Sequence, residues 1–183
     1  IAKIQNPSTN IIKVKYFTAP VKANFASHGR DSVTAQNAYH RALEYIYQQR
    51  IEIIKGYHTV ERGYPPSYQK PIDKDDRVEI WQFEEKQTDV NIALAMYKDA
   101  RDGEIHQQVL VSNDSDIEPA LKLIRADDLD IELGLIIPRS KSETDDKKRP
   151  TSTSLSQYAD WTRTHILDEE CQTAQLNDRI ATN

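Results

Sequence analysis

Residues 108–124 read QVLVSNDSDIEPALKLI, and this stretch decides the fold. Its first part belongs to a strand-like run at 106–112. Its second part has apolar residues at the i, i+3, i+4, i+7 spacing of a helix, namely Ile117, Ala120, Leu121 and Ile124. Ser115 and Glu118 have the spacing of a capping box, which begins a helix. A strand, a polar junction and a helix over 115–126 are therefore predicted.

Segments of the same two kinds continue on both sides of this stretch. Further strands are predicted at 10–20, 51–60, 77–86 and 130–138, and further helices at 34–49 and 88–103. Residues 61–76 contain prolines and tyrosines and are predicted to form a long exposed hairpin loop. Alternation of strand and helix is the signature of a mainly parallel sheet in an α/β layer fold.

The C-terminal part differs in composition from the rest. Residues 138–150, PRSKSETDDKKRP, are charged and poor in apolar residues, which predicts a mobile polar linker. Beyond them, one set of residues lies in helical register: Leu155, Tyr158, Ala159, Thr162 and Ile166. A helix over 153–168, resting on the sheet domain or on a partner chain, would bury that stripe. The predicted organisation is a main domain over 1–138, a linker over 139–150 and a helical appendage over 151–183.

Composition excludes several classes of protein. The chain has 183 residues, with 38% hydrophobic and 29% charged, which is typical of a soluble globular protein. No apolar run approaches the roughly 18–20 residues that span a bilayer, so no membrane association is expected. Cys171 is the single cysteine, so a disulfide framework is excluded and a cytoplasmic location is predicted. The chain begins at Ile1 without an initiator methionine, and we expect it to start some way into a longer protein.

Charge is spread unevenly along the chain. Residues 1–70 carry ten Lys/Arg against four Asp/Glu, and residues 71–183 carry 14 against 25, so +6 and −11 give the net −5. This asymmetry fits a basic face beside an acidic site, or a chance distribution over a solvated surface. Within the basic part, Lys22 and Arg30 follow the first predicted strand, and we expect them to bind phosphates of a substrate.

Carboxylates gather at two predicted junctions between a strand and a helix. Asp114 and Asp116 follow the strand at 106–112, and Asp89 follows the strand at 77–86, with Glu85 close before it. Ligands of open α/β sheets bind at the carboxyl ends of strands. Clustered carboxylates there suit a hard divalent cation. The alternative is that these residues cap helices, which acidic side chains do at a helix N-terminus. From the spacing alone both interpretations stay open.

Several stretches resemble the NYN domain, a member of the PIN-like group of metal-dependent nucleases. The pair EEKQTDVNIALAMYKDA (84–100) and VLVSNDSDIEPALKLI (109–124) carries the resemblance. VKYFTAPV (14–21) and QNAYHRALEY (36–45) match the second strand and following helix of the family, and the tail from Lys147 resembles one bacterial NYN group. The resemblance covers nearly the whole chain. It implies a PIN-like three-layer α/β fold with a mainly parallel central sheet, plus a helical C-terminal tail.

The resemblance also implies a site. The acidic residues of the family fall on Asp89, Asp114 and Asp116, which would bind Mg²⁺ or Mn²⁺, with Glu85 and Asn113 as neighbours. NYN domains begin with a strand bearing an aspartate, often in an Asp-Gly-x-Asn context, and no such motif precedes residue 13 here. About one strand and one helix of the family pattern are missing. Either the sequence is an excerpt, or this protein lacks a metal ligand.

Three functions are compatible with these features. The first is a Mg²⁺- or Mn²⁺-dependent ribonuclease acting on RNA rather than DNA. The second is a degenerate nucleic-acid-binding or scaffold module, which could also form a homo-oligomer. The third is a metal-dependent phosphatase, but those enzymes place an Asp-x-Asp motif on the first strand, whereas Asp114 and Asp116 lie late in the chain. The five histidines show no metal-ligand spacing.

Overall fold

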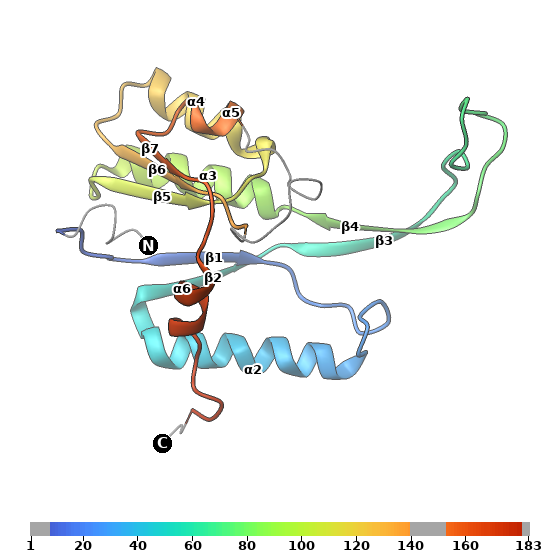
Figure 1. The fold of residues 1–183 in the computed structure, drawn as a ribbon, viewed down its shortest axis with the longest axis horizontal. Helices are drawn as coiled ribbons and strands as arrows, with labels where there is room; N and C mark the ends of the chain where they lie inside the picture. The colour runs from blue at the N-terminus through green and yellow to red at the C-terminus, as the bar shows by residue number, and fades with distance from the viewer. Residues whose placement is uncertain (1–7, 140–152, 181–183) are drawn as a thin grey trace. The chain divides into compact units, whose positions relative to one another are not determined.

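The computed structural model describes residues 8–139 and 153–180, which fall into two compact units (Figure 1). The N-terminal unit is Lys13–Thr88. The C-terminal unit is Asp89–Asn183 together with Ile1–Ile12. Within the described residues, no helix combines the length and the apolar character that crossing a membrane would need. Each unit is described by itself.

A parallel strand pair and a long helix begin the N-terminal unit. Strand β1 (Val14–Thr18) pairs in parallel with β2 (Ile51–Lys55), and α2 (Arg30–Tyr47) with the short 3₁₀ helix η1 (Gln48–Arg50) connects them. The helix buries His40 and Leu43. It begins at Arg30, four residues before the predicted start, and the strand predicted over 10–20 is limited to β1.

A two-stranded antiparallel hairpin completes this unit. Strand β3 (Tyr57–Gly63) pairs with β4 (Ile80–Lys86). The connection between these two strands is drawn at the far right of Figure 1. The predicted exposed hairpin loop is confirmed. The single strand predicted over 51–60 is wrong, because Gly56 separates β2 from β3 and the two strands join different sheets. Gly56 allows a close approach there, since a Cβ at this position would lie 2.4 Å from the carbonyl oxygen of Lys86.

The C-terminal unit is built on a three-stranded parallel sheet. Its order is β5 (Gln107–Val111), β6 (Glu132–Ile136) and β7 (Trp161–Arg163). Helix α3 (Thr88–Asp102) leads into β5, and η2 (Ser115–Ile117) with α4 (Glu118–Ala126) leads from β5 to β6. With β1–β2 also parallel, the predicted α/β fold with mainly parallel strands is confirmed.

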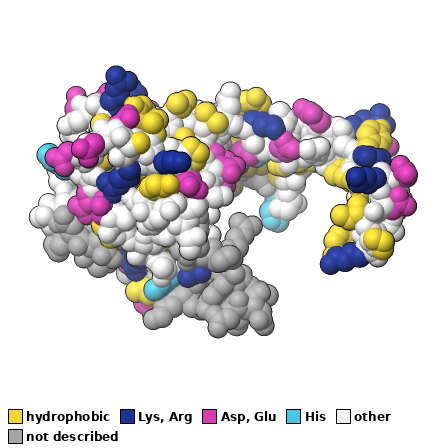
Figure 2. All heavy atoms as spheres, turned by 90° about the horizontal axis from the view of Figure 1, so that it is seen from above, with side chains coloured by type: hydrophobic (Ala, Val, Ile, Leu, Met, Phe, Trp, Pro, Cys, Tyr) yellow, Lys and Arg dark blue, Asp and Glu magenta, His cyan; other side chains and the backbone are white. Residues whose placement is uncertain are grey.

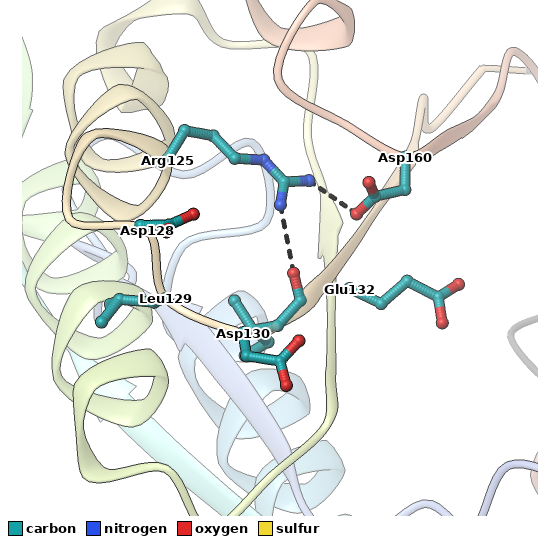
Figure 3. A pocket seen from close by; sticks show the side chains of 7 residues that line it. Arg125, Asp128, Leu129, Asp130, Glu132 and Asp160 are labelled. Atoms are coloured by element: carbon teal, nitrogen blue, oxygen red, sulfur yellow. Dashed lines mark hydrogen bonds and ion pairs between the residues drawn. The ribbon is translucent and has the colours of Figure 1, made fainter.

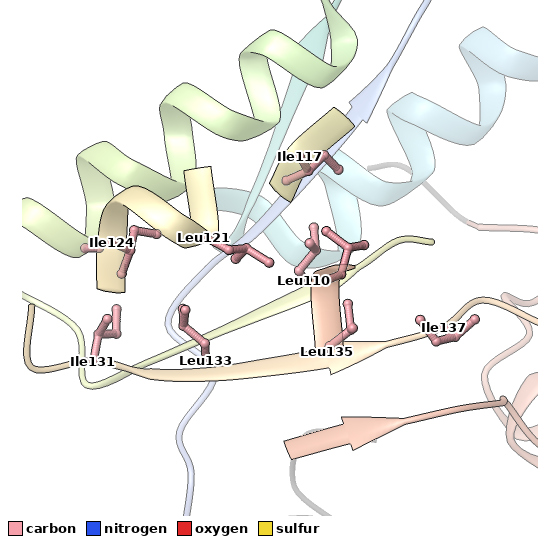
Figure 4. Close-up of a cluster of buried hydrophobic side chains, with 10 residues drawn as sticks. Leu110, Ile117, Leu121, Ile124, Ile131, Leu133, Leu135 and Ile137 are labelled. Carbon is pink, nitrogen blue, oxygen red and sulfur yellow. The ribbon is translucent and has the colours of Figure 1, made fainter. Parts of the chain in front are cut away.

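The core of this unit lies between the helices and the sheet (Figure 4). Buried side chains of α4 face buried side chains of β5 and β6, for example Leu121 and Leu133, each 2% exposed. This follows from sequence, since the helical spacing of α4 and the apolar run of β6 each present one continuous apolar surface. Gln108 also donates a 2.9 Å hydrogen bond to the carbonyl of Met96, which ties α3 to β5.

The segment after residue 152 does not form the predicted helix over 153–168. It contains α5 (Thr153–Ser156), then β7, then α6 (Asp168–Thr173). Leu155, which is fully buried, joins the core, so the prediction that this segment rests on the sheet domain holds while its secondary structure was wrong. The apolar residues of this segment do have helical spacing, but from Trp161 the chain pairs with β6 as a strand and does not continue as a helix. The predicted mobile linker falls largely on 140–152, outside the described residues.

Candidate active site

Asp114 and Asp116 lie in the loop that leaves the carboxyl end of β5. The amide of Asp114 donates to Ser112 Oγ at 3.0 Å, and Asp114 Oδ1 accepts from the amide of Asp116 at 3.1 Å. Ile117, which is fully buried, anchors η2 in the core. Both aspartates are exposed. The loop therefore presents two carboxylates to solvent at the edge where α/β sheets bind ligands, while one oxygen of Asp114 caps η2.

Asp89 reaches its position by another route than predicted. It is half-buried in the first turn of α3, as expected. The strand before it, β4, pairs with β3 in an antiparallel hairpin and is not part of the β5–β6–β7 sheet. The prediction placed Asp89 and Asp114 together because it assumed that β4 and β5 end at the same edge of one parallel sheet. That assumption is wrong, since the two strands belong to different sheets. Among residues 8–139 and 153–180, no group of three or more His, Cys, Asp or Glu side chains could hold a metal ion.

The remaining predicted residues are divided between the units. Asn113 is half-buried and directly precedes Asp114. Glu85 is exposed on β4, where it accepts a hydrogen bond from Thr88 Oγ1, and its Oε2 lies 3.9 Å from His58 Nε2. Lys22 is exposed in the loop after β1, and Arg30 is the exposed first residue of α2. Carboxylate oxygens are ligands that suit Mg²⁺ or Mn²⁺, so Asp89, Asp114 and Asp116 have the donor chemistry for such an ion, although the described structure does not bring the three together as one group.

A shallow pocket of about 720 Å³ lies at the opposite end of the sheet (Figure 3). It is lined by Arg125, Asp128, Leu129, Asp130, Ile131, Glu132 and Asp160. Glu132 is the first residue of β6, so the pocket lies at the amino end of that strand, away from the carboxyl edge that carries Asp114. This position does not favour a ligand site in an α/β sheet.

Arg125 explains the structure of that pocket. Its guanidinium donates to the carbonyls of Tyr158 at 2.9 Å and Ile131 at 3.2 Å and to Asp160 Oδ2 at 2.6 Å. Burial would raise the pKa of Asp160, but hydrogen bonds from the Leu133 amide and from Arg125 outweigh it and hold that pKa below its ordinary value of 3.8. The cluster therefore fastens α4 and β6 to the C-terminal segment.

An aromatic cluster on the hairpin was not predicted from the sequence. Phe25 stacks on Phe83 with ring centroids 5.5 Å apart, and its ring meets Trp81 edge-on at 6.3 Å. On the other side of Phe83, the His58 ring stacks at 4.5 Å. The alternation of Trp81 and Phe83 along β4 was a signal for one aromatic face. Phe25 carried no such signal, because its loop has no periodicity.

A parallel sheet with acidic residues in the loop at its carboxyl edge is an arrangement found in metal-dependent hydrolases of α/β type. The NYN domain family matches residues 9–164, and the chain belongs to this family. Its fold is therefore PIN-like.

A curated relative carries a different activity in its name. The chain is 38% identical over 168 residues to "6-hydroxy-3-succinoylpyridine 3-monooxygenase HspA" of Pseudomonas putida (strain DSM 28022 / S16). The match covers 89% of this chain and 52% of that protein, so the chain spans about half the length of this relative. No solved structure matches the chain.

Proposed function

We propose that the protein is a metal-dependent ribonuclease that hydrolyses phosphodiester bonds. The observation that carries this proposal is the loop after β5, which presents Asp114 and Asp116 at the carboxyl edge of a parallel sheet in a chain of the NYN family. The buried anchor Ile117 fixes this loop, so its carboxylates are held in place rather than on a free tail. Two fixed, exposed carboxylates suit a cation and a phosphate-bearing substrate.

The residues have separate roles in this proposal. Asp89, Asp114 and Asp116 would hold Mg²⁺ or Mn²⁺, which when bound activates water and stabilises charge on the scissile phosphate. Glu85 is a further acidic candidate. Asn113 would donate its side-chain amide to the substrate beside Asp114, a group that carries no charge to repel phosphate.

Outside the acidic loop, we propose that Lys22 and Arg30 bind phosphates of the RNA. We also propose a cytoplasmic location, since the exposed Cys171 is a free thiol, as is usual in a reducing compartment. Self-association into a homo-oligomer is part of the same proposal.

The decisive experiment uses Asp114→Asn in the full-length protein. Asparagine caps a helix about as well as aspartate, so the variant should fold while losing one negative charge. We expect RNA cleavage with Mg²⁺ or Mn²⁺ to fall about 10²–10³-fold, the range for removing one electrostatic contact at a reacting centre. Asp130→Asn is the matched control, because Asp130 is an exposed aspartate at the other end of the sheet and should leave cleavage unchanged. Equal cleavage by Asp114→Asn and wild type would refute the assignment.

Two other functions give different results in the same preparation. A degenerate binding module binds RNA but cleaves none with either metal ion. A monooxygenase acting on a hydroxylated pyridine is favoured by the similarity to the Pseudomonas protein. It would consume dioxygen when 6-hydroxy-3-succinoylpyridine and an electron donor are added, and mass spectrometry would detect the product. Oxygen consumption without RNA cleavage would replace the ribonuclease proposal with this one.

A further inference from the structure

The β3–β4 hairpin exposes large aromatic rings on one of its faces. Trp81 is 66% exposed, and Phe25 and Phe83 are 45% and 43% exposed. Exposed tryptophan and phenylalanine in one contiguous cluster mark an interaction site more often than a random surface. These rings form a cluster of their own, which we call the aromatic platform: Phe25, His58, Trp81 and Phe83.

Strand register places the platform on a single side of the hairpin. Val60 is opposite Phe83, and Arg62 is opposite Trp81. Residues directly opposite each other share a face, and successive residues alternate between faces. Trp81, Phe83, His58 and Arg62 therefore share one face. Tyr57, one residue from His58, belongs to the other face and is 46% exposed.

The platform is held in place before any ligand arrives. His58 Nδ1 lies 3.0 Å from the carbonyl oxygen of Pro20, within hydrogen-bonding distance, and its ring supports Phe83 from below at an interplanar angle of 14°. A tight turn holds Phe25, since the amides of Phe25 and Ala26 donate to the carbonyl of Lys22 at 2.9 and 3.1 Å. A surface held rigid in this way loses little conformational entropy on binding.

Two basic residues neighbour the platform, one in the turn that carries Phe25 and one in the strand pairing opposite Trp81. Lys22 begins the turn that carries Phe25 and makes no ion pair with any described residue. Arg62 lies opposite Trp81, where it pairs with Glu79 and lies 5.8 Å from the centre of the Tyr64 ring. Figure 2 shows more basic and apolar side chains together at the far end of the hairpin. The exposed aromatic and basic residues beyond the platform are Tyr64, Tyr68, Lys70, Lys74 and Arg77.

We propose that the aromatic platform binds single-stranded RNA by stacking bases on Trp81 and on the free face of Phe25, while Lys22 and Arg62 bind the flanking phosphates. Phe83, which is itself stacked on Phe25 and His58, supports these rings from within the platform. Flat rings with cations beside them match the alternation of bases and phosphates along a single strand. A duplex keeps its bases stacked on each other and offers no free base faces. This inference rests on the proposed RNA substrate, and it makes the single strand the preferred form of it.

The test measures binding separately from cleavage. Full-length protein is titrated in EDTA against a fluorescently labelled single-stranded RNA 12-mer and against the same sequence as a duplex, and anisotropy is recorded. We expect wild type to prefer the single strand. Trp81→Ala and Phe25→Ala should each weaken single-strand binding about 5- to 150-fold, the range for losing one stacked base. Trp81→Phe should restore most of the affinity, because it restores an aromatic face.

Tyr57→Ala is the matched control, since it removes an exposed tyrosine from the other face of the same hairpin. It should leave affinity unchanged. Thermal unfolding of each variant checks that the hairpin is intact. If Trp81→Ala and Phe25→Ala bind the single strand as tightly as wild type, the platform does not stack bases. Equal loss in Tyr57→Ala, or no binding of single strands by wild type, overturns the proposal as well.

Two further results separate this inference from its neighbours. If the platform variants change sedimentation from oligomer to monomer and leave RNA affinity unchanged, the face binds a second copy of the chain instead. With Mg²⁺ or Mn²⁺ added, binding through the platform without cleavage would refute the ribonuclease proposal and support the platform. RNA cleavage by a protein whose RNA affinity does not change in the platform variants would support the ribonuclease proposal and refute the platform.

Discussion

Replacing Gly134 by alanine tests the packing of β7 against β6. A Cβ on Gly134 would lie 2.1 Å from Cζ2 of Trp161 and 2.5 Å from Cε2, where carbon atoms normally stay about 3.5–4.0 Å apart. The indole would have to shift, yet its Nε1 donates a 2.9 Å hydrogen bond to Glu132. Overpacking costs about 1–3 kcal/mol, and losing a hydrogen bond to a charged group about 1.5–3 kcal/mol.

We therefore expect Gly134→Ala to lower the free energy of unfolding by about 2.5–6 kcal/mol. The melting temperature should fall by about 5–24 °C, at roughly 2–4 °C per kcal/mol for a chain of this size. Urea unfolding followed by circular dichroism measures the first quantity, and a thermal scan measures the second.

Two controls identify the cause. Gly63→Ala in β3 should cost clearly less than Gly134→Ala, since its Cβ would meet the movable amide of Gln82 at 3.0 Å and no aromatic ring. In a Trp161→Ala background the clash is gone, so adding Gly134→Ala should cost little, with a coupling energy above about 1 kcal/mol. If Gly134→Ala is as stable as wild type, or equally harmful with and without Trp161, the packing of β7 described above is wrong.

Three other predictions follow from the same structure. Leu155→Ala should lower the free energy of unfolding in urea by about 2–5 kcal/mol because Leu155 is fully buried. Leu94→Ala, at a position that is 63% exposed, should lower it by less than about 1 kcal/mol, and equal losses in the two variants would place Leu155 outside the core. The pKa of Asp160 is lowered from 3.8, so its charged form stabilises the fold above that pH and this stability is lost as pH falls. The loss of unfolding free energy in Asp160→Asn relative to wild type should therefore shrink between pH 7 and pH 3, and a loss that does not change with pH would contradict the lowered pKa. Charge reversal at both Lys22 and Arg30 should weaken RNA binding and reduce its salt slope by about 1.4, and an unchanged slope would remove both residues from the interface.

Local patterns predicted the elements that pack within a short stretch of chain. Helix α4 was predicted because its apolar residues repeat at helical spacing. Helix α3 was predicted from a run with apolar residues on most sides that ends at Gly103, whose φ is 70°. The position of Asp114 and Asp116 after a strand and before a helical turn was predicted for the same reason. These features depend on neighbours a few residues away.

Features that depend on distant partners could not be predicted. Trp161 lies in a strand because β6 offers an open edge and Gly134 leaves room for its indole, and neither fact appears in the residues around it. Asp160 finds Arg125 thirty-five residues away. The convergence expected of Asp89 and Asp114 assumed that β4 joins the parallel sheet, but β4 pairs with its sequence neighbour β3, which is the connection of lower entropy cost.

The parallel pairing of β7 with β6 sets an order for making the protein. Strand β6 ends at Ile136, but its second neighbour begins only at Trp161, so a chain still being synthesised carries β6 as an open edge until those residues emerge from the ribosome. Open edges of apolar strands are templates for pairing with other chains. A shortened protein that stops at residue 138 would keep that edge permanently, together with the core surface that Leu155 covers. Shortened proteins that end there should aggregate, and those that extend past Arg163 should not.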